Sequence, residues 1–173
     1  MKRVLLPLMF AVVTMPVTIG AQTPAGAKPA PAAPTAKPAA AAPTQAGEAR
    51  TIELVVKDDM KFDKPALTAK PGEKLRIVLK NMGAMPKMAA GHNFVLLKLG
   101  ADALKFANAA VMAGPTYIPE SMKDQILAAT PLTGPGETVE VTFTVPTAPG
   151  TYNFLCTFAG HFAQNMKGTL VVK

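Results

Sequence analysis

The most informative part of the chain is its last stretch, GTYNFLCTFAGHFAQNMKGTLVVK, residues 150–173. Its start, residues 151–156, has the composition of a β-strand, and residues 168–173 form a second strand-like run. The first run ends at Cys156, the only cysteine of the chain, and one of the two histidines, His161, lies between the runs. The stretch therefore predicts two strands joined by a loop that carries candidate metal ligands.

Strand-like runs also precede this stretch, from residue 51 onward, and turn residues separate them. The clearest run spans residues 138–145, where every second residue from Val139 to Val145 is apolar and faces one side. The other runs are residues 52–57, 75–80 and 92–98. Many short strands at this spacing predict an all-β fold of two packed sheets, a β-sandwich.

One segment, residues 101–130, interrupts the strand pattern. Residues 102–112 are rich in alanine and carry apolar residues at helical spacing, namely Leu104, Ala107 and Val111. Residues 121–128 predict a second short helix. We therefore expect a partly helical excursion attached to the sandwich.

The N-terminal part of the chain predicts export. Residues 1–21 have a basic start at Lys2 and Arg3, an apolar run and small residues for cleavage, as a secretory signal peptide does. Residues 22–50 are rich in Ala and Pro and lack large apolar residues, which predicts a disordered linker. The folded domain would then comprise residues 51–173. If the signal is retained, the linker becomes a tether to the membrane.

The charge of the chain argues against nucleic acid as a partner. The net charge is +7, but 13 of the 18 basic and ten of the 11 acidic residues lie from Thr51 onward, which leaves the domain at +3. A surface that mixes both signs of charge does not have the basic footprint of a nucleic-acid binder. An exported protein of this kind belongs in the periplasm or on the outer face of the cytoplasmic membrane.

The chain offers the ligand set of a blue-copper electron-transfer site, which combines a thiolate, two imidazoles and a weak thioether. Cys156, His161 and Met166 follow one another at intervals of five residues, and His92 opens a predicted strand. Because Cys156 ends one strand and Gly168 begins the next, the loop between them can fold back and bring three ligands to one point.

Three further methionines, Met82, Met85 and Met88, lie outside this set. Two interpretations remain open for them. They form a Met-rich rim that docks partners or handles Cu(I), or they fill core and loop space as flexible apolar side chains.

The motifs around these ligands resemble those of azurins and auracyanins, the small blue-copper proteins called cupredoxins. Residues 91–93 are similar to the family's Gly-His-Asn segment, and residues 150–161 with 166–170 resemble its ligand loop and final strand. The four residues between the second histidine and the methionine are more similar to auracyanins. The resemblance covers residues 51–173 and implies an eight-stranded Greek-key β-sandwich.

The resemblance implies one type 1 copper ion per chain and a one-electron carrier rather than an enzyme. The implied ligands are His92, Cys156, His161 and Met166. Partners would be redox proteins, such as a cytochrome or a membrane electron-transfer complex, with no small-molecule substrate. A copper enzyme would need further histidines, and the chain has only two. The alternative is a non-redox periplasmic copper carrier that uses the same ligands and the Met-rich segment.

The resemblance also implies residues that surround the metal. Asn93 would hydrogen-bond to the Cys156–Thr157 region, and backbone N–H groups near Asn93 and Phe158 would donate to the Cys156 sulfur. The Gly91 carbonyl would be a weak axial ligand.

A surface for partners is also expected around the second histidine. The electron would leave through an exposed edge of His161, and an apolar docking patch would surround it, formed by Phe158, Ala159, Gly160 and Phe162. Ala159 stands where the family commonly has proline, and this restores a backbone N–H group near the thiolate.

Overall fold

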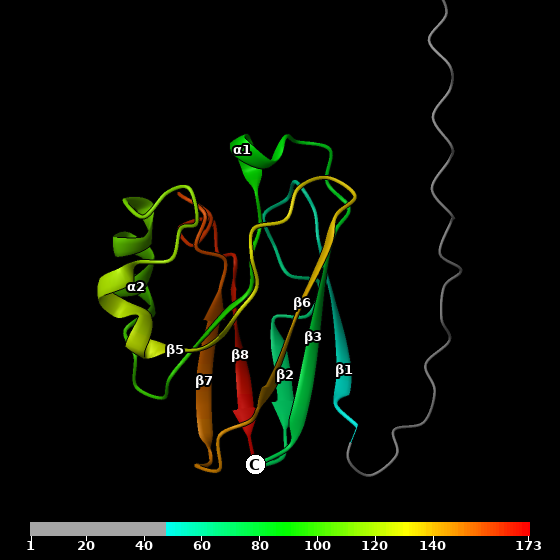
Figure 1. The fold of residues 1–173 in the computed structure, drawn as a ribbon, viewed down its shortest axis with the longest axis vertical. Coiled ribbons are helices and arrows are strands. Elements are labelled where there is room, and N and C mark those ends of the chain that lie inside the picture. The colour runs from blue at the N-terminus through cyan, green and yellow to red at the C-terminus, as the bar shows by residue number, and fades with distance from the viewer. Residues whose placement is uncertain (1–47) are drawn as a thin grey trace, which may run out of the picture. The chain divides into compact units, whose positions relative to one another are not determined.

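The computed structural model describes residues 48–173 (Figure 1). The predicted signal, residues 1–21, and nearly all of the predicted linker, residues 22–50, lie outside the described residues. The elements follow in the order β1 (Arg50–Val56), β2 (Ala66–Ala69), β3 (Lys74–Asn81), α1 (Lys87–Ala90), β4 (Val95–Leu97), α2 (Ala103–Val111), the 3-10 helix η1 (Glu120–Gln125), β5 (Ile126–Ala129), β6 (Thr138–Thr144), β7 (Gly150–Leu155) and β8 (Lys167–Val172).

The strands form two sheets. One has the order β1-β3-β6 and the other the order β2-β8-β7-β4-β5. The β1-β3 and β2-β8 pairs are parallel, and the other pairs are antiparallel. Strands distant in sequence are therefore neighbours, and the expected all-β fold of two packed sheets is confirmed.

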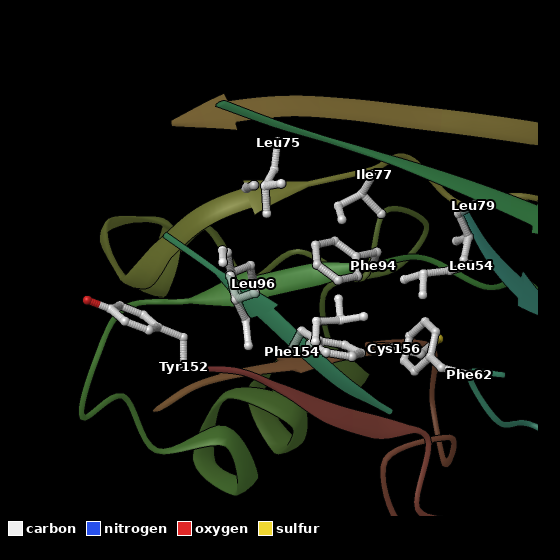
Figure 2. Close-up of a cluster of buried hydrophobic side chains, with 14 of the residues drawn as sticks. Leu54, Phe62, Leu75, Ile77, Leu79, Phe94, Leu96, Tyr152, Phe154 and Cys156 are labelled. Carbon is white, nitrogen blue, oxygen red and sulfur yellow. The ribbon is translucent and has the colours of Figure 1, made fainter. Parts of the chain in front are cut away.

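The main core lies between the two sheets. In β3 the buried residues Leu75, Ile77 and Leu79 alternate with more exposed ones, as period-two patterning requires. Figure 2 shows these side chains pointing toward Phe94 and Phe154, whose rings lie 5.1 Å apart. Each fully buried side chain of this size contributes about 1.5–3 kcal/mol of hydrophobic stabilisation.

Helix α2 confirms the expected helix but buries a different face. Its side chains Phe106, Ala107 and Ala110 are buried, whereas Leu104 and Val111, which we took to mark the apolar face, are exposed. The helix begins at Asp102, whose Oδ1 accepts hydrogen bonds from the backbone N–H groups that open the helix. Phe106 packs into a second apolar cluster on the outer side of the larger sheet.

The second predicted helix, residues 121–128, is only partly correct. A 3-10 helix ends at Gln125, and Ile126–Ala129 form β5, an edge strand that pairs with β4. Residues 126–129 extend because the backbone of β4 offers unpaired hydrogen-bonding groups on that side. Within residues 48–173 we find no helix with both the length and the apolar character that crossing a membrane requires.

The segment that contains α1 and the loop after β7 lie at the same end of the sandwich. Strands β3 and β7 run toward the upper end in Figure 1, where α1 and the loop after β7 both lie. The predicted strand 92–98 is shorter than expected, since β4 covers only Val95–Leu97. His92 instead forms an isolated bridge with Thr133, which leaves it at the rim of the sheet.

Candidate metal centre

Three side chains with metal-binding atoms converge at this end of the sandwich. One ligand atom each from His92, Cys156 and His161 lies within 4.8 Å of the others. The Cys156 Sγ and His161 Nδ1 atoms are 3.5 Å apart, and the two imidazole centroids are 4.9 Å apart. All three residues are buried.

Backbone hydrogen bonds close the loop between β7 and β8. The Cys156 N–H donates to the Met166 carbonyl over 3.1 Å, and the Met166 N–H donates to the His161 carbonyl over 3.0 Å. These bonds bring the two ends of the loop together, as the sequence predicts. Met166 is fully buried in the same apolar cluster as Cys156.

The backbone around His92 is fixed from two sides. Its N–H donates to the Thr133 carbonyl over 3.0 Å, and its own carbonyl accepts from the Thr133 N–H over 2.7 Å. Gly91 ends α1, and a Cβ atom there would lie 2.7 Å from the Lys87 carbonyl oxygen. Only glycine therefore fits before His92 without a shift of the helix.

Asn93 joins the two ligand-bearing segments. Its Oδ1 accepts from the Thr157 N–H over 2.9 Å, and its Nδ2 donates to Thr157 Oγ1 over 2.8 Å. Both residues are buried, so these bonds are shielded from water. The structure thus contains the bond that the resemblance implies between Asn93 and the Cys156–Thr157 region.

Two effects of the surroundings act in opposite directions on the pKa of the Cys156 thiol. Burial raises the pKa of the Cys156 thiol to about 11, and hydrogen bonds from the backbone N–H groups of Asn93 and Phe158 act in the opposite direction. Without a cation, the thiol therefore stays protonated at neutral pH. A metal ion would displace this proton, because a coordinating thiol is deprotonated.

Both imidazoles are held in their neutral form. Burial and the nearby His92 lower the pKa of His161 to about 4. Burial also lowers the pKa of His92, although the carboxylates of Asp58 and Asp59 partly oppose this. Neutral imidazole is the form that ligates metals, so both rings are ready to bind at neutral pH.

The ring nitrogens of His92 supply a direct test of whether a metal fits. Both Nδ1 and Nε2 are buried, and neither has a partner at full hydrogen-bonding geometry, although a weaker contact with the Lys57 backbone reaches the ring. Buried polar atoms nearly always have a partner, and a metal ion is one that satisfies an imidazole nitrogen. One soft sulfur and two imidazoles suit copper, so the residues present fit that ion.

The expected exposed edge of His161 is wrong. Only 2% of His161 is exposed, because the Phe158 ring lies against it with centroids 4.7 Å apart. The Tyr117 ring in turn lies 4.7 Å from Phe158. The sequence gives no sign of Tyr117, since it comes from the excursion and reaches the site only through the fold.

The four residues of the predicted docking patch differ in their exposure and in what they pack against. Gly160 is exposed and Ala159 partly buried, but Phe158 is buried over His161. Phe162 packs instead against the second apolar cluster under α2, and the Lys167 ammonium lies 4.7 Å from its ring centroid.

Comparisons with known proteins agree with this geometry. Residues 51–173 match the family described as copper binding proteins of the plastocyanin/azurin family. The chain is 44% identical over 126 residues to auracyanin-A of Chloroflexus aurantiacus, which covers 70% of this chain and 74% of that protein. It is 40% identical over 121 residues to an azurin of Pseudomonas fluorescens biotype C, covering 67% and 92%.

Solved structures give the same result. The auracyanin A of C. aurantiacus, described as a "blue" copper protein, is 42% identical with a TM-score of 0.65, covering 73% of this chain and all of that one. Dithionite-reduced auracyanin from Roseiflexus castenholzii is 38% identical with a TM-score of 0.64, covering 73% and 99%.

Proposed function

The chain belongs to the plastocyanin/azurin family of copper-binding proteins, and we propose that His92, Cys156 and His161 hold its copper ion. The protein is a type 1 copper electron carrier, and its partners are redox proteins. When bound, copper supplies the one-electron chemistry by alternating between Cu(II) and Cu(I). The observation that carries the ligand assignment is the meeting of three buried donor atoms within 4.8 Å.

Met166 completes the proposed ligand set as the weak axial thioether. Its support is its full burial beside Cys156 and the two backbone bonds that hold it in the loop. A long thioether contact is a common fourth interaction in such sites. The Gly91 carbonyl is our candidate for a weak ligand on the opposite side, because Gly91 directly precedes His92.

The surrounding residues fix the ligands and exclude water. Asn93 ties the His92 segment to Thr157, and backbone N–H groups of Asn93 and Phe158 donate to the Cys156 sulfur. Outer bonds of this kind orient ligands and tune a metal. A site held this firmly changes little between oxidation states, and this suits a protein whose task is fast electron exchange.

We place the contact with partners over Phe158 and its neighbours Ala159 and Gly160. Phe158 lies against His161, so a redox protein that docks there contacts a side chain that touches a proposed ligand. Redox encounters use small, weak interfaces. A cytochrome or a membrane electron-transfer complex is the class of partner that we propose.

Export is a further part of the proposal. The signal-like residues 1–21 and the Ala- and Pro-rich residues 22–50 support a mature domain of residues 51–173 in the periplasm or on the outer face of the membrane. The mass of the chain recovered from an expressing bacterium tests this. Loss of about 21 residues indicates cleavage, and a full-length, membrane-bound chain indicates a retained anchor.

A redox titration tests electron transfer against copper storage. We expect the dialysed protein to retain one copper per chain and to accept and release one electron reversibly. A protein that keeps several labile Cu(I) ions and shows no reversible oxidation would be a storage protein. His92→Ala is the matched variant, since it removes one ligand and leaves Cys156 and His161 in place.

A further inference from the structure

Three exposed methionines lie in the segment that leads from β3 to His92, outside the proposed ligand set. Met82, Met85 and Met88 are 66%, 40% and 81% exposed. Methionine is usually buried, as Met122 and Met166 are here. The three methionines follow one another at intervals of three residues in one segment, so they are not scattered surface residues.

The backbone of this segment is held while its side chains remain in solvent. The Met82 N–H donates to the Val56 carbonyl over 2.9 Å, and the N–H groups of Ala84 and Met85 donate to the Asp58 carboxylate over 2.9 and 3.3 Å. Core filling would need buried side chains, so the observed exposure argues against core filling for all three methionines.

The segment leads directly to the centre. It connects the end of β3 to His92, and Met88 lies on α1, four residues before that ligand. Met88 also lines a groove of about 530 Å³ together with Tyr117, Leu132 and Phe158. Because Phe158 lies against His161, the groove extends from a free thioether to the wall of the centre.

The chemistry of these groups favours one ion. Thioethers are soft, uncharged ligands that select Cu(I) over hard cations. The ligands of the centre are buried, so copper must enter along some path from the surface. The methionine side chain has three rotatable bonds, which lets neighbouring thioethers turn toward a shared ion.

We propose that Met82, Met85 and Met88 form a second, weaker Cu(I) site through which copper enters the centre. The site takes one Cu(I) ion per chain and passes it to His92, Cys156 and His161 with no change in oxidation state, and the Cys156 thiol releases its proton to water as the sulfur binds the ion. This inference rests on the proposed function, since it takes that centre as the destination.

A Cu(I) titration of the copper-loaded full chain tests the binding step. The reduced protein competes without oxygen against a chromophoric Cu(I) chelator, and we expect one further Cu(I) equivalent. The Met82→Leu/Met85→Leu/Met88→Leu variant should lose this equivalent, because leucine keeps the apolar surface but lacks sulfur. Met112→Leu is the matched control, since Met112 is 88% exposed but lies outside the segment, and it should retain the equivalent.

The loading rate tests the entry step. Transfer of copper from the Cu(I) chelate to the metal-free protein should slow about tenfold in the triple leucine variant, with the final copper content unchanged. Absence of the further equivalent in the natural chain, or equal titration and loading in the triple variant, would overturn the inference. If the triple leucine variant matches the natural chain in both measurements, the three side chains would instead belong to an apolar docking surface.

The two proposals fail in different ways. A loaded protein without the thiolate-to-copper absorption band contradicts the ligand assignment of the centre, and the Cu(I) titration of the methionines can still be read. A normal band without a further Cu(I) equivalent overturns the entry site alone.

Discussion

Asn93 shows how a single side chain connects two parts of the site that are distant in sequence. It bonds to both the backbone and the hydroxyl of Thr157, across 64 residues of chain. The histidine before it and the cysteine before Thr157 are therefore held at a fixed separation. The Gly-His-Asn pattern made this residue predictable, whereas Thr133, which holds the His92 backbone, belongs to no motif.

Asn93→Ala should destabilise the metal-free protein by about 2 kcal/mol, because it leaves the buried Thr157 N–H without a partner. Chemical denaturation measures the change in the free energy of unfolding. Thr157→Val is the matched variant, since it removes only the hydroxyl and keeps the backbone N–H bonded to Asn93. An Asn93→Ala protein as stable as the natural one would show that the bond contributes nothing.

Glu73 predicts a pH dependence of stability. The Arg50 guanidinium donates to its carboxylate and lowers the pKa of Glu73, and the Lys70 N–H also bonds to it over 2.7 Å. A carboxyl whose pKa is lowered by folding stabilises the protein above its unfolded pKa. This stabilisation is lost as the pH falls through the lower, folded value.

Glu73→Gln should therefore reduce the free energy of unfolding by about 1 kcal/mol at neutral pH. The gap to the natural protein should close in acid below the ordinary glutamate pKa of 4.5. Urea unfolding midpoints of both proteins at neutral and acid pH measure this difference in stability. Glu53→Gln, which breaks the more exposed pair with Lys80, is the control and should have a smaller effect. A gap that is equal at both pH values would contradict the account.

At the scale of elements, α2 shows where sequence patterns stop being sufficient. Apolar spacing located the helix correctly, but it indicated Leu104 and Val111 for the buried face, whereas the large side chain that is buried is Phe106. Phe106 is buried because the outer side of the larger sheet offers Val95, Leu97 and Leu155. That surface exists only after strands distant in sequence have paired, so a local pattern could not identify it.

Phe106→Ala should cost about 3–5 kcal/mol of stability, the usual loss for a buried aromatic side chain. Leu104→Ala on the same helix should change stability by less than about 0.5 kcal/mol, since the side chain is exposed. Thermal and chemical denaturation of both variants measure this. Equal losses would mean that the helix packs through its other face.

Strand β5 is a second case in which tertiary pairing overrides local pattern. Residues 126–128 belong to the predicted helix 121–128, but in the structure they form part of β5 at the edge of the larger sheet beside β4. Residues 138–145, by contrast, were predictable because strict alternation leaves little choice of structure. A sequence pattern therefore predicts a strand correctly where it alternates strictly. Where the pattern is ambiguous, pairing with a neighbouring strand determines the structure.

At the scale of the whole molecule, the site is assembled from two segments that are distant in sequence and meet at one end of the sandwich. His92 arrives after β3 and α1, while the other ligands come from the loop that joins β7 to β8. His92, Cys156 and His161 could be predicted because cysteine and histidine are so rare in this chain, and Met166 by its place in the loop among ten methionines. The aromatic cover over His161 could not, since Tyr117 meets Phe158 only in the folded protein.

Metal removal should lower the stability of the whole domain. A ligand that binds only the folded state stabilises it by about 2.7 kcal/mol at a hundredfold excess over its Kd. We therefore expect one equivalent of copper to raise the melting temperature and a chelator to reverse the change. His92→Ala should remove most of this effect, and an unchanged melting temperature on copper addition to the natural chain would contradict it.

The most direct test of the centre is the absorption and EPR spectrum of the copper-loaded protein. We predict an intense thiolate-to-copper band on the order of 600 nm, which Cys156→Ala abolishes. A colourless Cu(II)-loaded protein, or a band that persists without the Cys156 sulfur, would contradict the proposal that Cys156 and the two histidines hold the copper.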